Sequence, residues 1–60
     1  MKTAREIRKE NGLSTDYVAS KLSLKRASYL RRERGEVEWK ASELKAFSAL
    51  TGVPIEEIAT

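Results

Sequence analysis

Five of the thirteen residues in the stretch SLKRASYLRRERG, residues 23–35, are arginine or lysine. Leu24, Ala27, Tyr29 and Leu30 lie between them. Guanidinium and ammonium groups at this density bind polyanions, because each offers a positive charge and several N–H donors to phosphate oxygens. Taken alone, such a cluster is equally well interpreted as a solvated helix surface.

Charge is unevenly distributed along the chain. Residues 1–34 hold ten Arg or Lys against four Asp or Glu, a net charge of +6. Residues 35–60 hold two Lys against five Glu, a net charge of −3. We therefore expect the first part of the chain to attract polyanions and the second part not to attract them.

The composition excludes several kinds of site. Histidine and cysteine are both absent, so the chain lacks the usual metal ligands, the usual proton shuttle at neutral pH and any disulfide. An enzyme is the poorest interpretation, because its nucleophile would need a pocket that a small helical domain has little room to form. We expect no cofactor, no metal ion and no small-molecule ligand.

The length suits one small domain. Sixty residues are near the lower limit for folding by burial of a core, so apolar packing must supply the stability of domain 1–60. The longest apolar runs are too short to cross a membrane. The N-terminal stretch MKTAREIRKENG is charged and lacks the apolar segment of a secretory signal. These features predict a cytosolic protein.

Two short helices are predicted at the start of the chain. Thr3 and Glu6 have the spacing of a capping box, so a first helix is expected near 3–11. Ser14 suits the N-cap of a second helix, whose apolar face continues to about residue 22.

A third helix follows after a tight turn. It is expected to run from Lys25 to Gly35, where glycine favours the left-handed conformation that ends a helix. Residues 36–40 alternate polar and apolar types, which is a strand signal, but this run has no partner strand and no hairpin turn. We expect an extended connection in which Trp39 covers the core.

The last third of the chain has helical spacing again. Residues 44–50 carry large apolar side chains three positions apart, which predicts a fourth helix. Pro54 suits the first turn of a fifth helix whose Ile55 and Ile58 face inward. The predicted fold class is therefore all-α, a small five-helix bundle.

The predicted second and third helices, with the turn between them, form a helix-turn-helix. Such a unit presents its second helix outward, so that side chains can enter the major groove of DNA. Many small helical bundles contain short helices and tight turns, and the signal alone is weak. Here the helix after the turn is also the basic one, which favours polyanion binding over a solvated face.

Residues 7–35, IRKENGLSTDYVASKLSLKRASYLRRERG, resemble the Cro and phage-repressor family, the lambda-repressor-like or XRE-type helix-turn-helix domains. The matching positions are Arg8, Gly12, Leu13, Ala19, Leu22, Arg26, Ser28, Glu33, Arg34 and Gly35. The tail LKAFSALTGVPIEEI is similar to the family's fourth helix, glycine turn and fifth helix. The resemblance implies a lambda-repressor-like bundle in the cytosol of a bacterium or of a phage-infected host.

The resemblance also implies roles for particular side chains. The residues expected at base edges are Arg26, Ala27, Ser28, Leu30 and Arg31. The residues expected at phosphates are Ser14, Thr15, Lys25, Arg34 and Arg8. Arg8 and Glu33 match a structural ion pair between the first and third helices. Base contacts read sequence, at about 1–3 kcal/mol for a good bidentate pair, whereas phosphate contacts set the register.

Several positions depart from the family pattern. Ser23 stands where the family prefers glycine in the turn, and Lys25 stands where Ser or Thr usually caps the third helix. Leu30 occupies an outward slot. Arg32 occupies a normally apolar slot, where either its methylene groups cover the core and its charge reaches Glu33 or solvent, or the third helix is rotated and the set of base-reading residues changes slightly.

The resemblance implies a sequence-specific regulator of transcription, a small Cro- or repressor-type protein that binds double-stranded DNA. Its third helix, about 25–34, would lie in the major groove. One such helix covers few base pairs, so we expect a weak homodimer on a two-fold operator. The expected interface lies around Trp39, Phe47 or Ile55–Ile58.

Two other hypotheses stay open at this point. The same scaffold can serve as a protein-binding module, such as an antitoxin half or an adaptor, which predicts an exposed apolar patch around the last helices. Alternatively, GEVEWKAS, residues 35–42, forms part of a wing, as in excisionase-like domains.

Overall fold

The computed structural model describes residues 1–60, with helices as the main elements. The four α-helices are α1 (Ala4–Glu10), α2 (Thr15–Lys21), α3 (Arg26–Glu33) and α4 (Ala41–Thr51). A single 3-10 turn, η1 (Ile55–Glu57), follows them. The two-residue strands β1 (Lys2–Thr3) and β2 (Ile58–Ala59) pair in parallel, with Lys2 opposite Ile58 and Thr3 opposite Ala59.

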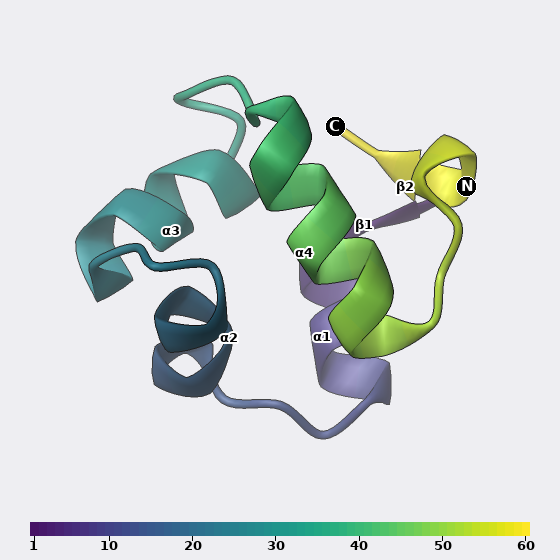
Figure 1. The fold of residues 1–60 in the computed structure, drawn as a ribbon, viewed down its shortest axis with the longest axis horizontal. Coiled ribbons are helices and arrows are strands. Elements are labelled where there is room, and N and C mark those ends of the chain that lie inside the picture. Colours follow the sequence, from purple (N-terminus) through teal and green to yellow (C-terminus); the bar gives the residue numbers. More distant parts are fainter.

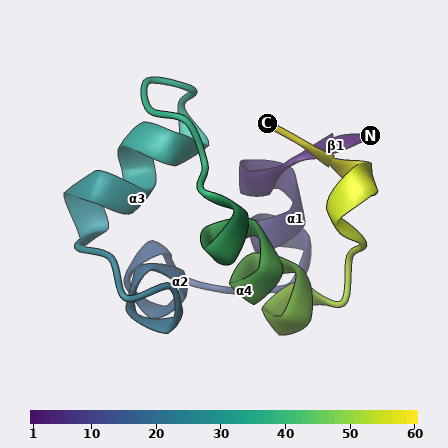
Figure 2. The same cartoon turned by 45° about the horizontal axis from the view of Figure 1, so that its top comes forward.

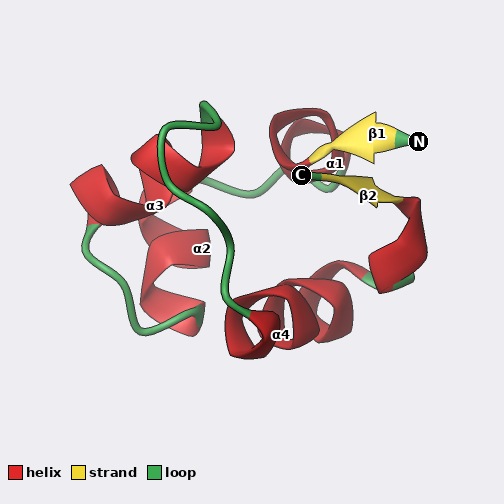
Figure 3. Cartoon of the chain, turned by 90° about the horizontal axis from the view of Figure 1, so that it is seen from above, coloured by secondary structure: helices red, strands yellow, loops and turns green.

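The helices surround one core. In two views, α2 and α3 lie together on one side of the molecule, and α1 and α4 lie on the other side (Figure 1, Figure 2). The strands β1 and β2 bring the two ends of the chain close together (Figure 3). The largest fully buried side chains are Ile7, Val18, Tyr29 and Phe47. Each of the four α-helices supplies one of them, so the core ties all four together.

The predicted N-caps of α1 and α2 are confirmed. The Thr3 hydroxyl accepts a hydrogen bond from the Glu6 N–H (3.2 Å), and the Glu6 carboxylate accepts one from the Thr3 N–H (3.0 Å). The Ser14 hydroxyl accepts a hydrogen bond from the Tyr17 N–H (3.1 Å). Each cap satisfies a backbone donor that the helix leaves free and contributes about 1 kcal/mol.

The prediction of a fifth α-helix is wrong. After Pro54 the chain forms only the three-residue turn η1, and Ile58 then has extended backbone angles (φ −93°, ψ 120°). This extended backbone pairs with β1, which a continuing helix would prevent. Ile58 is buried, with 3% exposed, but Ile55 is 38% exposed. Only one of the two isoleucines therefore faces inward.

The segment between α3 and α4 is an irregular loop, and the strands lie elsewhere, so the wing hypothesis is wrong. Trp39 contacts Tyr29 and Phe47 edge-on, with ring centroids 6.0 Å and 5.4 Å away. Its indole N–H donates to the Arg32 carbonyl (3.2 Å). Trp39 therefore covers the core, as expected, and fastens the loop to the end of α3.

Candidate nucleic-acid interface

The turn between α2 and α3 sets the geometry of the helix-turn-helix. The Leu24 N–H donates to the Ala19 carbonyl (2.8 Å), and the Ser23 N–H donates to the Ser20 carbonyl (3.1 Å). These two bonds form a Schellman motif at the end of α2. Ser23 has a left-handed conformation (φ +59°) where the motif favours glycine. This backbone costs a serine about 1 kcal/mol, so the departure from the family pattern carries an energetic cost.

The helix α3 begins without a side-chain cap. Lys25 is the N-cap residue, and its side chain accepts no hydrogen bond from the first turn. An ammonium group has donors only, so Lys25 cannot replace the usual serine or threonine. The Lys25 side chain lies in solvent at the start of α3.

One face of α3 is turned to solvent and the other to the core, where Tyr29 is fully buried. Of the five side chains expected at base edges, three are exposed and two are half-buried: Arg26, Ala27 and Arg31, then Ser28 and Leu30. Leu30 is absent from the core cluster and its partly buried neighbours. With about 100° between successive residues, Arg26 and Arg31 lie at the two edges of this face, with Leu30 and Ala27 between them.

Two exposed arginines at this surface are paired with carboxylates. Arg26 Nε lies 3.3 Å from Asp16 Oδ1, and Arg34 Nε lies 2.8 Å from Glu36 Oε2. All four side chains are more than half exposed, so each pair contributes at most about 1 kcal/mol. Arg31 is the arginine of α3 without an ion pair. Its whole guanidinium group is available to a ligand.

A buried ion pair joins α1 to α3. Arg8 Nε and Nη2 donate to the two oxygens of Glu33 (2.9 and 3.3 Å), and Nη1 donates to the Leu13 carbonyl (3.1 Å). The two side chains are 12% and 4% exposed. Burial would raise the pKa of Glu33, but the hydrogen bonds and the charge of Arg8, with further contributions from the Tyr29 hydroxyl and Arg5, together lower the pKa below its usual value. Arg8 is engaged in the fold, and the structure gives no support to its expected phosphate contact.

A second buried ion pair joins α3 to α4. Arg32 Nε donates to Glu43 Oε1 (2.8 Å), and the side chains are 11% and 7% exposed. The expectation that Arg32 reaches Glu33 or solvent is wrong, because Glu33 is held by Arg8. The same Glu43 oxygen accepts from the Lys40 N–H (2.8 Å). Burial would raise the pKa of Glu43, but these hydrogen bonds bring it below the usual value.

Sequence reasoning missed two carboxylates at this site. Asp16 lies in the first turn of α2, where a carboxylate favours the helix dipole, and it also contacts Arg26. Glu43 lies three residues after Lys40, the N-cap of α4, and accepts a hydrogen bond from the Lys40 N–H. This spacing of a glutamate from the N-cap is visible in the sequence. Its pairing with Arg32 has no local signal, since eleven residues separate them.

A comparison with protein families matches residues 5–58 to the family described as Helix-turn-helix. The match covers nearly the whole chain. The chain belongs to this XRE-type, lambda-repressor-like helix-turn-helix family. It is accordingly a DNA-binding regulatory domain. No curated protein and no solved structure matches the chain.

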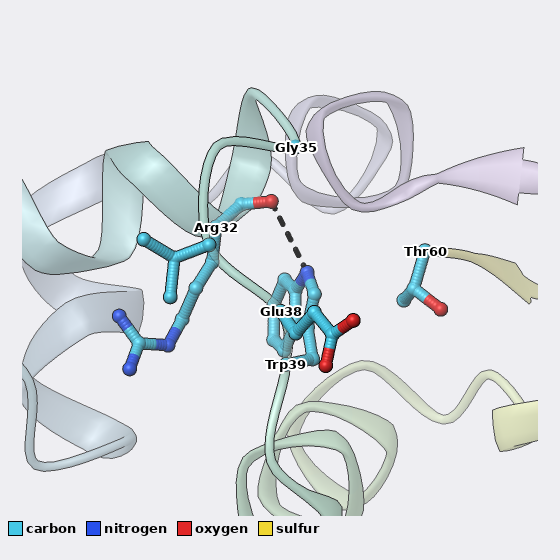
Figure 4. Close-up of a pocket in the computed structure, with 6 residues that line it drawn as sticks. Arg32, Gly35, Glu38, Trp39 and Thr60 are labelled. Atoms are coloured by element: carbon cyan, nitrogen blue, oxygen red, sulfur yellow. Dashed lines mark hydrogen bonds between the residues drawn. The ribbon is translucent and has the colours of Figure 1, made fainter.

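The helix-turn-helix domain has one larger pocket, at the end of α3 that is remote from Arg26. The pocket has a volume of about 360 Å³ and is lined by Arg32, Gly35, Val37, Glu38, Trp39 and Thr60 (Figure 4). Figure 4 shows the Trp39 indole hydrogen-bonded to the Arg32 carbonyl at its wall. No group of three or more His, Cys, Asp or Glu is placed to hold a metal ion. None of the helices is long and apolar enough to span a bilayer.

The apolar side chains expected at an interface are mostly buried in the helix-turn-helix domain. Phe47 has no exposed surface, and Ile58 is 3% exposed. Both pack into the core instead of facing a partner. The expectation that they contribute to an interface is therefore wrong, and Ile55 is the exposed large side chain of this region.

Proposed function

We propose that this domain is a sequence-specific regulator of transcription that places α3 in the major groove of double-stranded DNA. The exposed face of α3, with an arginine at each edge, carries the proposal. The eight residues of α3 make a helix about 12 Å long and, with side chains, about 10–12 Å wide. The major groove is about 12 Å wide. The width of α3 therefore matches the width of the groove.

The chemistry of the exposed face suits direct reading of bases. Arg26 and Arg31 each offer the planar donor fork that binds the O6 and N7 of guanine. Ala27 and Leu30 lie between them and offer methyl groups to the methyl of thymine. Ser28 lies at the margin of this face and is half-buried. We assign sequence reading chiefly to Arg26 and Arg31.

Polar and basic residues around α3 suit contacts with the DNA backbone. Lys25 and Arg34 lie at the two ends of α3, and Ser14 and Thr15 begin α2. In the proposed complex they contact phosphates and set the register of α3 in the groove. Each phosphate that is neutralised releases counterions, so log K falls against log salt with a slope of about −0.9 per contact.

The size of the domain supports binding as a homodimer. Its longest principal extent is 24 Å, whereas successive major grooves on one face of DNA are about 34 Å apart. A single copy therefore reaches only one major groove on that face. Two copies related by a two-fold axis would read an inverted repeat with half-sites one helical turn apart. Ile55, Val37 and Trp39 remain available to such a contact.

Selection from a random duplex pool at moderate salt tests the proposal. The purified domain should enrich an inverted repeat, and Arg31→Ala should relax one base pair in each half-site by about tenfold or more. Lys45→Ala is a charge-matched control, because Lys45 is exposed on α4 and has no ion pair. It should lower affinity without changing the base preference. A pool that shows no enrichment would refute sequence-specific binding and favour a protein-binding module.

A further inference from the structure

The contact between Asp16 and Arg26 joins the two helices of the helix-turn-helix at their N-terminal ends. Asp16 is the second residue of α2, and Arg26 is the first residue of α3. The Schellman turn around Ser23 connects the C-terminal end of α2 to the start of α3, and the Asp16 contact adds a link from the other end of α2. Asp16 Oδ1 lies 3.3 Å from Arg26 Nε, on one edge of the guanidinium group. The contact is an ion pair between two exposed side chains, 65% and 78% exposed.

We infer that Asp16 is a positioning residue which makes Arg26 selective for guanine. This inference rests on the proposed function, because it assumes that Arg26 reads a base. A guanidinium whose carboxylate contact lies at Nε can present its two terminal N–H groups together, and guanine is the base with two acceptors, O6 and N7, at that spacing. Adenine offers one acceptor and one donor there, so it leaves a donor of Arg26 unpaired.

Without the carboxylate, Arg26 has more ways to bind DNA. A free arginine on an exposed helix end can turn to a single acceptor on another base or to a phosphate oxygen. Asp16 limits these alternatives in two ways. It orders the side chain before binding, which reduces the entropy lost with the correct base. The negative charge of Asp16 also repels a neighbouring phosphate, which makes it less favourable for Arg26 to contact that phosphate.

The surface offers a carboxylate for comparison. Glu36 pairs with Arg34 through Nε at 2.8 Å, and both side chains are more than half exposed, like Asp16 and Arg26. Arg34 lies at the end of α3, outside the predicted base-reading positions. Glu36→Gln and Asp16→Asn therefore remove the same charge from equally exposed pairs. They differ in whether the partner arginine reads a base.

The experiment measures binding to the selected duplex and to its single base-pair variants by fluorescence anisotropy. Arg26→Ala identifies the base pair that Arg26 reads, through a loss of discrimination of about tenfold or more. At that base pair, Asp16→Asn should reduce the preference for guanine by about two- to fivefold, the coupling expected of an exposed pair. Glu36→Gln should leave the preference unchanged. Both neutral variants should bind random duplex more tightly than the wild type.

The double variant and the circular dichroism spectrum complete the test. Asp16→Asn combined with Arg26→Ala should discriminate no less than Arg26→Ala alone, because Asp16 acts through Arg26. An Asp16→Asn variant that is folded and keeps the full preference, as Glu36→Gln does, would overturn the inference and leave the proposed function standing. If Arg26→Ala alters no base preference, the inference fails with the assignment of Arg26. If the pool yields no preferred sequence, the proposed function itself fails.

Discussion

The ion pair between Arg32 and Glu43 links α3 to α4 where only 11% and 7% of the two side chains are exposed. Glu43→Gln leaves the Arg32 charge without a counter-ion in a place that water barely reaches. Removing one partner of a buried pair costs about 3–5 kcal/mol. The glutamine oxygen can still accept from the Lys40 N–H, so we expect the lower end, about 3 kcal/mol.

This cost is large for so small a domain. At about 0.05–0.15 kcal/mol per residue, 60 residues give a free energy of unfolding of about 3–9 kcal/mol. Arg32→Leu removes the other charge and leaves the Glu43 carboxylate buried without its cation, which is also destabilising. The double variant Arg32→Leu/Glu43→Gln removes both charges and should lose less than about 1 kcal/mol. The two single changes are therefore expected to be strongly non-additive.

Urea denaturation at pH 7 measures these free energies. Trp39 is the single tryptophan of the chain and contacts both Tyr29 and Phe47, so its fluorescence reports loss of the core. Glu36→Gln, which breaks an exposed pair with Arg34, is the control and should lose less than about 1 kcal/mol. The reasoning is refuted if Glu43→Gln loses no more than this control, or if the double variant loses the sum of the single losses.

Three further predictions concern other parts of the fold. Ser23→Gly relieves the left-handed backbone (φ +59°) and should stabilise the domain by up to about 1 kcal/mol in urea melts. Ser20→Gly, within α2, should destabilise it, and equal effects would contradict the assigned strain. Tyr29→Phe removes a buried hydroxyl without a hydrogen bond of good geometry, although the Arg8–Glu33 pair lies close enough to shift the pKa of this hydroxyl, so the melting temperature should stay close to that of the wild type. A loss above about 1 kcal/mol would mean that the hydroxyl is bonded. The pKa values of Glu33 and Glu43 lie below the ordinary 4.5 in the folded state, so near that pH the unfolded chain binds more protons. The contribution of these two carboxylates to the free energy of unfolding should be fully present above about pH 4.5. It should be lost as the pH falls through their folded pKa values. Glu33→Gln should flatten this acid dependence, and an unchanged pH profile would contradict the linkage.

The local features of the fold were predictable from the sequence. The caps at Thr3 and Ser14 and the left-handed Gly35 depend on residues within one turn of each helix end. The position of Trp39 over the core followed from its size and from the lack of a strand partner. Side-chain types near one another along the chain were enough for each of these features.

Other features depend on residues far apart in the chain, and they were missed. The β1–β2 pairing joins residues 2–3 to residues 58–59, and it replaces the expected fifth helix with η1 and an extended end. The burial of Phe47, which was expected at an interface, depends on packing between distant parts of the chain. No local pattern of two residues announces a strand whose partner lies at the other end of the chain.

The sequence by itself determined that the fold is mainly helical, that the 23–35 stretch is basic and that two of the helices form a helix-turn-helix. Helix periodicity, caps and charge are local properties, so a sequence shows them directly. Only the tertiary structure decided which charges are free. The fold pairs Arg32 with Glu43, places Asp16 against Arg26, and leaves Arg31 unpaired, whereas the pair of Arg8 with Glu33 was already expected from the family resemblance. Ion pairing depends on distances of a few ångströms between side chains on different helices, and those distances are set when the helices pack around the core.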